Sequence, residues 1–320
     1  MAYIIAEIGF NHEGDMALAR RMIVEAGKAG ANAVKFQTFR AKDIALPCSP
    51  HFSLIEGGEM TFEQHRDFYD VAVDSGLDFL STPFSPWAVE LLEKLGVAAY
   101  KIASMDCINQ HLLGIVAQTR KPIYLSTGMA ALDEISRSLE FLESMKGGPV
   151  TLLHCVSCYP AKQEELNLSI ISLLKQVFKR PVGYSDHSVG IKACLAAAML
   201  GAEIIETHFT MDSRKAGGDH SHSVEPSELR ELISEITLFE RMRGTPVAIR
   251  DRPDRSQAKI LRRGVYSATD LKMGQVVTEQ NLLLARPVST LSPNDVQRIL
   301  GRVLTKDVRC FSEILEADLS

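Results

Sequence analysis

Chemically capable side chains stand at the carboxyl ends of the short apolar runs in the first part of this chain. Carboxylates can exchange protons, lysines can bind an anion, and imidazoles can bind a metal ion or move a proton. In a barrel of parallel strands these ends converge on one mouth, where such groups act together. We therefore expect an enzyme. The runs end in Glu7, Lys35 with Gln37, Ser81 with Thr82, Lys101 with Ser104, Ser126 with Thr127, His154, Ser185 with Asp186 and His187, and Glu206 with His208.

Lys35 and Lys101 are the cations among these strand-end residues. A buried lysine without an anionic partner is destabilising, so each one needs a counter-charge. A bound anionic substrate would supply it, and we favour this interpretation because of the position at a barrel mouth. The alternative is a structural ion pair with Glu7 or Asp186.

His187 and His208 end neighbouring strands, so their rings can meet over the barrel. Two neutral imidazoles suit a first-row divalent ion whose remaining positions are filled by water and substrate oxygens. The ligands are too few for a closed structural zinc site. Glu206 lies two residues before His208 on the same strand face, where it can support the metal or its water. An ordinary hydrogen-bonding role for each histidine is the alternative.

Alternating strand and helix patterns provide the framework that these residues need. Eight βα units that close near Arg243 match the size of a (β/α)8 barrel, about 250 residues. A doubly wound open sheet is the competing fold, but it has no use for functional residues on every strand. Met16–Ala29, ended by Gly30, is typical of the expected helices. The expected strands are Tyr3–Ile8, Ala33–Gln37, Asp78–Ser81, Ala98–Ile102, Pro122–Ser126, Val150–His154, Val182–Ser185 and Glu203–His208.

The sequence predicts a barrel over residues 1–243, a linker over 244–255 and a small β-rich domain over 256–320. The linker is rich in Arg, Pro and Asp. Beyond it, short strands and turns replace the barrel pattern. The segments Asp270–Leu282 and Asp307–Leu319 resemble each other, which indicates an internal duplication, with chance similarity as the alternative.

Composition excludes several classes of protein. Of the 320 residues, 46% are hydrophobic and 23% are charged, which is typical of a chain that buries a full core. The net charge of -5 and the lack of a long basic run argue against a nucleic-acid partner. Neither a membrane-spanning stretch nor a signal-peptide pattern is present, so we expect a cytoplasmic protein without a membrane partner. Its six scattered cysteines fit a reducing compartment.

Two further motifs have competing interpretations. Cys155 and Cys158 have CxxC spacing, but they leave a strand end and have no second pair for zinc, so we interpret them as buried thiols. Asp219–His222 reads DHSH, which suggests either a metal-binding tract or a substrate lid in the loop after the eighth strand.

Nine short segments, taken together and in order, resemble the motifs of the sialic acid synthase family. These enzymes make N-acetylneuraminate and the related bacterial nonulosonates legionaminate and pseudaminate. The resemblance runs from about Ile4 to the C-terminus, where the sequence is similar to the family's small antifreeze-like domain, called SAF. The order of the segments is specific, whereas each one alone is weak. They are EIGFNHEG (Glu7–Gly14), VKFQTF (Val34–Phe39), STPFS (Ser81–Ser85), YKIAS (Tyr100–Ser104), LSTGM (Leu125–Met129), LLHC with YP (Leu152–Pro160), YSDHS (Tyr184–Ser188), ETHFT (Glu206–Thr210) and GGDHSHSVEP (Gly217–Pro226).

The resemblance implies an α/β protein in which a TIM barrel is followed by an SAF domain of the β-clip type. It also implies sites for phosphoenolpyruvate, an acylamino sugar and a divalent metal, with Mn²⁺ favoured and Mg²⁺ or Co²⁺ as alternatives. The implied catalytic residues are Glu7, Lys101 and Asp219; the phosphoenolpyruvate ligands are Lys35, Thr82, Lys101, Ser104, Ser126, Ser157 and Ser185; the sugar ligands are Glu7, Gln37, Tyr159, Glu206, Asp219 and Arg286; and the metal ligands are His187 and His208.

The implied reaction joins phosphoenolpyruvate to N-acetylmannosamine or a related acylamino hexose and releases phosphate. The FNHEG form of the first motif favours N-acetylneuraminate or legionaminate synthase over pseudaminate synthase or another phosphoenolpyruvate-dependent sugar synthase. The long segment from Arg40 to Met60 is where we expect the sugar's substituents to bind. Two other classes stay open: a Schiff-base aldolase with Lys101 as nucleophile, and a non-catalytic sugar-binding protein.

The resemblance also implies a domain-swapped homodimer. Arg286, in the segment LLARP, matches an arginine that reaches the sugar in the partner chain's active site. A surface arginine of little energetic consequence is the alternative.

Overall fold

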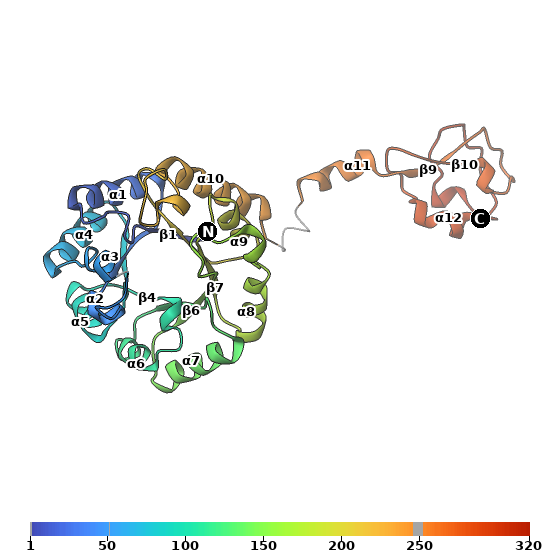
Figure 1. The fold of residues 1–320 in the computed structure, drawn as a ribbon. Helices are drawn as coiled ribbons and strands as arrows, with labels where there is room; N and C mark the ends of the chain where they lie inside the picture. Colours follow the sequence, from blue (N-terminus) through green and yellow to red (C-terminus); the bar gives the residue numbers. More distant parts are fainter. Residues whose placement is uncertain (1, 51, 246–251) are drawn as a thin grey trace. The chain divides into compact units, whose positions relative to one another are not determined.

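The computed structural model describes residues 2–50, 52–245 and 252–320. The chain forms two compact units, 1–243 and 244–320, and each is described by itself (Figure 1). The predicted linker over 244–255 includes residues 246–251, which lie outside the described residues.

The first unit is a ring of parallel strands surrounded by helices (Figure 1). The sheet runs in the order β3-β2-β1-β8-β7-β6-β5-β4, and its end strands β3 and β4 lie in contact, which closes the barrel. The observed strands differ from the predicted ranges by no more than two residues at any end. They are β1 (Tyr3–Glu7), β2 (Ala33–Thr38), β3 (Asp78–Pro83), β4 (Tyr100–Ile102), β5 (Ile123–Ser126), β6 (Val150–Cys155), β7 (Val182–Asp186) and β8 (Ile204–His208).

The predicted helix Met16–Ala29 is present as α1, and its ends follow from local chemistry. Asp15 precedes the helix and its side chain accepts hydrogen bonds from the backbone of Ala17 and Leu18, while Gly30 ends the helix at a φ of 98°. The other helices of the barrel unit are α2 (Ala41–Ile44), α3 (Phe52–Glu56), α4 (Phe62–Asp74), α5 (Pro86–Leu95), α6 (Gln110–Gln118), α7 (Leu132–Ser144), α8 (Ile170–Phe178), α9 (Lys192–Met199) and α10 (Pro226–Arg243).

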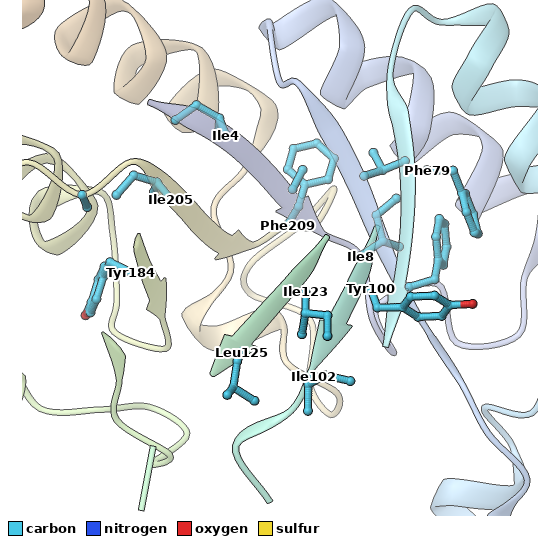
Figure 2. Close-up of a cluster of buried hydrophobic side chains, with 14 of the residues drawn as sticks. Ile4, Ile8, Phe79, Tyr100, Ile102, Ile123, Leu125, Tyr184, Ile205 and Phe209 are labelled. Carbon is cyan, nitrogen blue, oxygen red and sulfur yellow. The ribbon is translucent and has the colours of Figure 1, made fainter. Parts of the chain in front are cut away.

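The strands have two buried faces, because helices cover the outside and side chains fill the inside. The outer face packs a large apolar cluster against the helices, and Figure 2 shows part of it, including Ile4, Phe79, Tyr100, Ile205 and Phe209. A smaller cluster fills the bottom of the barrel. It consists of Ile5, Ala33, Leu80, Ala99, Leu153 and Ile204, with Tyr3 and Tyr124 packed against it.

The alternation of side chains along each strand places a polar layer directly above this small cluster. Successive strand residues point to opposite faces, so the residue two positions after an inward residue also points inward. In this barrel those residues are chemically active rather than apolar. This polar layer, the cavity floor, lies directly above the inner cluster, and each of its members is two residues beyond a member of that cluster. It consists of Glu7, Lys35, Thr82, Lys101, Cys155 and Glu206.

The second unit has its own core, which includes Val265, Leu271, Ile299 and Ile314. It contains α11 (Ala258–Leu261) and α12 (Val296–Ile299), and strand β9 (Gly264–Ser267) pairs antiparallel with β10 (Leu282–Ala285).

The two similar segments of the second unit are joined reciprocally. Asp270 accepts a hydrogen bond from the backbone N–H of Cys310 at 2.8 Å, and Asp307 accepts one from the N–H of Met273 at 2.9 Å. Each donor lies three residues beyond the other segment's aspartate. Leu271 and Val308, which follow the two aspartates, also pair as an antiparallel bridge. Equivalent contacts in both directions favour internal duplication over chance similarity.

Candidate active site

A cavity of about 490 Å³ opens at the carboxyl ends of the barrel strands. All of the predicted site residues that belong to the barrel line it, whereas Arg286 belongs to the second unit. The predicted lining residues are Glu7, Lys35, Gln37, Thr82, Lys101, Ser104, Ser126, Ser157, Tyr159, Ser185, His187, Glu206, His208 and Asp219.

Buried charges of both signs meet on the cavity floor. Lys35 Nζ lies 2.6 Å from Glu7 Oε2 and 3.9 Å from Glu206 Oε2, while Lys101 Nζ lies 3.4 Å from Glu206 Oε1. The four residues are between 1% and 4% exposed. The ion pair of Lys35 with Glu7, which was the structural alternative from sequence, is therefore present. The suggested pairing with Asp186 is wrong, because that carboxylate points outward to the hydroxyl of Tyr184 and the thiol of Cys194.

The two carboxylates of this floor differ in protonation behaviour. Burial raises the pKa of Glu7 from 4.5 to about 7, and the neighbouring Glu206 adds to the rise, although Lys35 opposes it. Burial also disfavours ionisation of Glu206, but Lys101, Lys35 and a hydrogen bond from Ser185 outweigh it and lower the pKa of Glu206. Glu7 is thus able to exchange a proton near neutrality, while Glu206 stays ionised. When Glu7 is protonated, two lysines face one carboxylate and the floor attracts an anion.

Small hydrogen-bonding groups surround the lysines. Thr82 accepts a hydrogen bond from Lys35 at 3.2 Å, and Ser104 accepts one from the backbone N–H of Gly128 at 3.1 Å. The hydroxyl of Ser126 is buried and has no hydrogen-bond partner among the described residues. A Cβ at Gly128 would lie 2.5 Å from Ser157 Oγ and 2.7 Å from Ser104 Oγ, so glycine is required for these groups to converge. The arrangement suits an anion with several oxygens.

Three imidazole rings lie in a row beside the cavity floor. The ring centroids of His187 and His208 are 5.4 Å apart, and those of His208 and His222 are 4.9 Å apart. Burial lowers the pKa of all three, and for His208 the neighbouring imidazoles lower it further. They are therefore neutral near pH 7, the form that binds metals. His187 Nδ1 bonds the backbone carbonyl of Val156 at 2.8 Å, which orients its other nitrogen as metal-bound histidines are usually oriented.

His222 could also hold a metal, although the sequence pattern did not single it out. Ligand atoms of His208, Asp219 and His222 lie within 4.8 Å of one another. The buried Nδ1 of His208 and Nε2 of His222 lack a hydrogen-bond partner among the described residues, so a cation would satisfy both. The DHSH pattern was the available signal, but its sequence does not say which histidine points into the barrel. His220 instead bonds Thr210 and faces Glu13.

The sugar-site residues predicted from the resemblance surround these groups. Gln37 donates a hydrogen bond to Glu7 Oε1 at 3.3 Å. The Tyr159 ring lies 4.2 Å from the ring of His187, and 56% of Tyr159 is exposed at the mouth. A second cavity of about 540 Å³ shares Phe10, Ile55 and Asp219 with the first one. Residues of the Arg40–Met60 segment line both cavities, as their predicted contact with substituents requires.

One expectation about the cysteines is wrong. Cys155 is buried, but Cys158 is exposed because it lies in the loop after β6 rather than on the strand. Both are free thiols.

Comparison with known proteins agrees with this geometry. The sequence profile of the NeuB family matches residues 22–248, and that of the SAF domain matches residues 262–309. The chain belongs to the NeuB family. This NeuB-family chain is 37% identical to the N,N'-diacetyllegionaminic acid synthase of Campylobacter jejuni, across 96% of each protein. It is 30% identical to a pseudaminic acid synthase of Campylobacter jejuni, across 99% of this chain and 96% of the relative.

A solved structure supports the same assignment. The N-acetylneuraminic acid synthetase of Leptospira borgpetersenii superposes on the NeuB-family chain with a TM-score of 0.77 and 36% sequence identity, covering 80% of this chain and 90% of that one. The TIM barrel and the SAF domain expected from sequence are therefore both confirmed. Within the described part of the chain, no helix is both long and apolar enough to cross a membrane.

Proposed function

We propose that this protein is a nonulosonate synthase that condenses phosphoenolpyruvate with an N-acylated mannosamine-type sugar and releases phosphate. The observation that carries the proposal is the convergence of two buried lysines, a ring of hydroxyls and the neutral imidazoles of His187 and His208 on one cavity. Membership of a family whose named relatives make sialic, legionaminic and pseudaminic acids supports it.

Phosphoenolpyruvate needs cations for its phosphate and carboxylate groups. Lys35 and Lys101 supply two such cations, and Ser104, Ser126 and the Gly128 turn supply neutral donors around them. The floor already holds two carboxylates, so binding of a further anion favours the protonated form of Glu7. Thr82, Ser157 and Ser185 complete the proposed phosphoenolpyruvate site.

The formation of the carbon–carbon bond follows from the functional groups of the two substrates. C3 of phosphoenolpyruvate attacks the aldehyde carbon of the open-chain sugar, water adds at C2, and the tetrahedral intermediate expels phosphate. His187 and His208 would hold a divalent cation, Mn²⁺ in our proposal, which polarises the aldehyde oxygen when bound. Glu7, whose pKa lies near 7, is placed to exchange a proton with the attacking water or the new hydroxyl. Asp219 is the second proposed acid–base residue, and Glu206 holds Lys101 in place.

The acceptor that we favour carries more than one acylamino group, as in legionaminate synthesis. The chain is more similar to the legionaminic acid synthase of Campylobacter jejuni, at 37%, than to its pseudaminic acid synthase, at 30%. The second cavity, beyond Phe10 and Asp219, offers space for a substituent far from the reacting aldehyde. N-Acetylmannosamine, the precursor of N-acetylneuraminate, is the second candidate acceptor.

The deciding experiment measures phosphate release from phosphoenolpyruvate with a panel of N-acetylmannosamine and diacetamido-trideoxyhexose acceptors. The proposal expects release that depends on one class of acceptor, and a 2-keto acid formed in equal amount. Trapping of a substrate on Lys101 by borohydride, with activity that persists in chelator, would instead identify a Schiff-base aldolase. Sugar binding without phosphate release would identify a binding protein.

We further propose that the active protein is a homodimer in which the SAF domain of one chain serves the barrel of the other. In this proposal the protein acts on small-molecule substrates in the cytoplasm, and neither a nucleic acid nor a membrane is a partner. Arg286 is the residue proposed to contact the sugar's acyl group in the partner chain.

A further inference from the structure

Two imidazole nitrogens that face one carboxylate form an unexplained feature of this cavity. His208 Nδ1 lies 3.5 Å from Asp219 Oδ2, and His222 Nε2 lies 3.7 Å from Asp219 Oδ1. These separations are too long for hydrogen bonds, and neither nitrogen has another partner within the described part of the chain. His208 and His222 are 6% and 3% exposed, so water does not readily satisfy them. A buried polar atom without a partner is unfavourable and points to a missing ligand.

The loop that carries two of these groups is held firmly in place. Asn11 accepts a hydrogen bond from the backbone N–H of Asp219 at 2.9 Å and donates one to Ser223 Oγ at 2.8 Å. The hydroxyl of Ser223 donates to the backbone carbonyl of Asp219. The N–H of Val224 donates to the carbonyl of His208 at 2.8 Å, which ties the loop to the end of β8. The three ligand groups are thus positioned by backbone contacts that do not use the ligand atoms.

We propose that His208, Asp219 and His222 together bind the divalent cation of this site, so that His222 is a protein ligand in addition to the histidine pair expected from sequence. Two imidazoles and one carboxylate on one side of an ion form a ligand set that leaves the remaining positions open for water and substrate oxygens. The distances of 3.5 and 3.7 Å to the Asp219 oxygens, and a separation of at most 4.8 Å among the ligand atoms, place all three groups within reach of one ion after small side-chain movements. The inference rests on the proposed function only in requiring a divalent cation, and it gives Asp219 a role in metal binding in place of the acid–base role proposed above.

The assignment differs from a site built on His187 and His208 alone. His187 lies on the other flank of His208, with one nitrogen already engaged by the Val156 carbonyl. Mn²⁺ held only by that pair would make His222 dispensable for metal binding. Mn²⁺ held by the proposed set makes His222 and Asp219 necessary whether or not His187 also contributes.

The test measures binding of Mn²⁺ alone to the full-length chain, by titration calorimetry and by the electron paramagnetic resonance signal of free Mn²⁺. His222→Ala and Asp219→Asn should each weaken binding about tenfold or more, as His208→Ala should. His220→Ala is the matched control, because His220 lies on the same short turn and is equally buried, but its ring faces Thr210 and Glu13; it should retain wild-type affinity. His222→Gln, which better preserves volume, guards against a folding defect, and thermal melting checks each variant.

Wild-type Mn²⁺ affinity in folded His222→Ala and His222→Gln would overturn the proposal. A second readout uses Co²⁺, whose visible absorption spectrum should change in the His222 variants and stay unchanged in His220→Ala. Because no substrate is present, these results are independent of the reaction. Absence of phosphate release by the wild type would reject the proposed function while leaving the metal site intact.

Discussion

The carboxylate of Glu7 lies 2.6 Å from the ammonium group of Lys35, and both side chains are buried on the adjacent strands β1 and β2. The parallel register places these two residues directly opposite each other. Despite this contact, burial and the nearby Glu206 raise the pKa of Glu7 to about 7. The pair is thus poised to change its protonation state near physiological pH, which makes the following consequences measurable.

The first prediction concerns stability and pH. Because the pKa of Glu7 rises from 4.5 in the unfolded chain to about 7 in the native one, the native protein binds more protons between these values. The tighter binding of the Glu7 proton in the native protein contributes stability that is fully present below the unfolded pKa and is lost as pH rises through the folded pKa. Relative to a variant that cannot ionise at this position, the free energy of unfolding of the wild type should fall with pH across this window, by at most about 1.4 kcal/mol per pH unit. The buried histidines, whose pKa is lowered, act in the opposite direction, but they do so equally in both proteins.

Urea unfolding followed by the fluorescence of Trp87 measures this effect. Trp87 is the chain's one tryptophan and lies on α5, so its signal reports on the barrel unit. Glu7→Gln cannot ionise, so the difference in free energy of unfolding between the wild type and this variant should fall as pH rises through the window. An identical pH profile in the wild type and Glu7→Gln would contradict the assignment.

The second prediction concerns the metal. Chelation, or replacement of His187 or His208 by alanine, should abolish turnover because the aldehyde then lacks an electrophilic partner. Mn²⁺ should restore the chelated wild type but neither variant. His154→Ala is a control, since this buried histidine instead bonds the carbonyl of Leu166. Full turnover in excess chelator would exclude a metal-dependent reaction.

The third prediction concerns the lysines. Lys35→Ala and Lys101→Ala should each lower kcat/KM for phosphoenolpyruvate about ten- to 150-fold, equivalent to about 1.5–3 kcal/mol, because each removes a charged hydrogen-bond donor. Lys121→Ala is the matched control, since it also breaks an ion pair, with Glu93, but away from the cavity. The control should change kcat/KM little. Wild-type kinetics in both Lys35→Ala and Lys101→Ala would mean that their ion pairs serve only the fold.

The fourth prediction uses the crowding at Gly128. A methyl group there would lie within 3 Å of the hydroxyls of Ser104 and Ser157, so Gly128→Ala should push these groups apart and raise KM for phosphoenolpyruvate about tenfold or more. Gly114→Ala, on α6, is the control because the new Cβ would only touch Phe141 at 3.4 Å. Unchanged KM in a folded Gly128→Ala variant would show that this turn does not bind the substrate.

Most of the floor of the site follows from two facts that a sequence contains. Parallel strands bring their ends together, and side chains alternate between two faces, so Glu7, Lys35, Lys101 and Glu206 had to converge once the strands were placed. The same alternation shows why Asp186 is not a partner of the lysines: its neighbour Ser185 points inward, so Asp186 points outward.

The loops carry no such periodicity, and there the sequence was less informative. His222 lies beyond β8 on the short turn η3 (His220–His222), and its direction depends on hydrogen bonds made by Asn11, which is distant in sequence. Cys158 is exposed for a related reason, because the strand that buries Cys155 ends before it. Local patterns predicted strand positions well, but loop side chains required the long-range contacts of the folded chain.

The last prediction concerns Arg286 and the proposed homodimer. Lys101→Ala and Arg286→Ala should each have strongly reduced activity alone, because one lacks a barrel cation and the other lacks the cation proposed to reach the sugar. Under conditions that allow subunit exchange, a mixed dimer contains one site built from an intact barrel of the second chain and an intact SAF domain of the first. Phosphate release should therefore return on mixing, towards a quarter of the wild-type rate at equal amounts, because about half the dimers are mixed and each has one working site. If Arg286 acts within its own chain, every site keeps one defect and mixing restores nothing, which would reject the swapped dimer while leaving the barrel chemistry untouched.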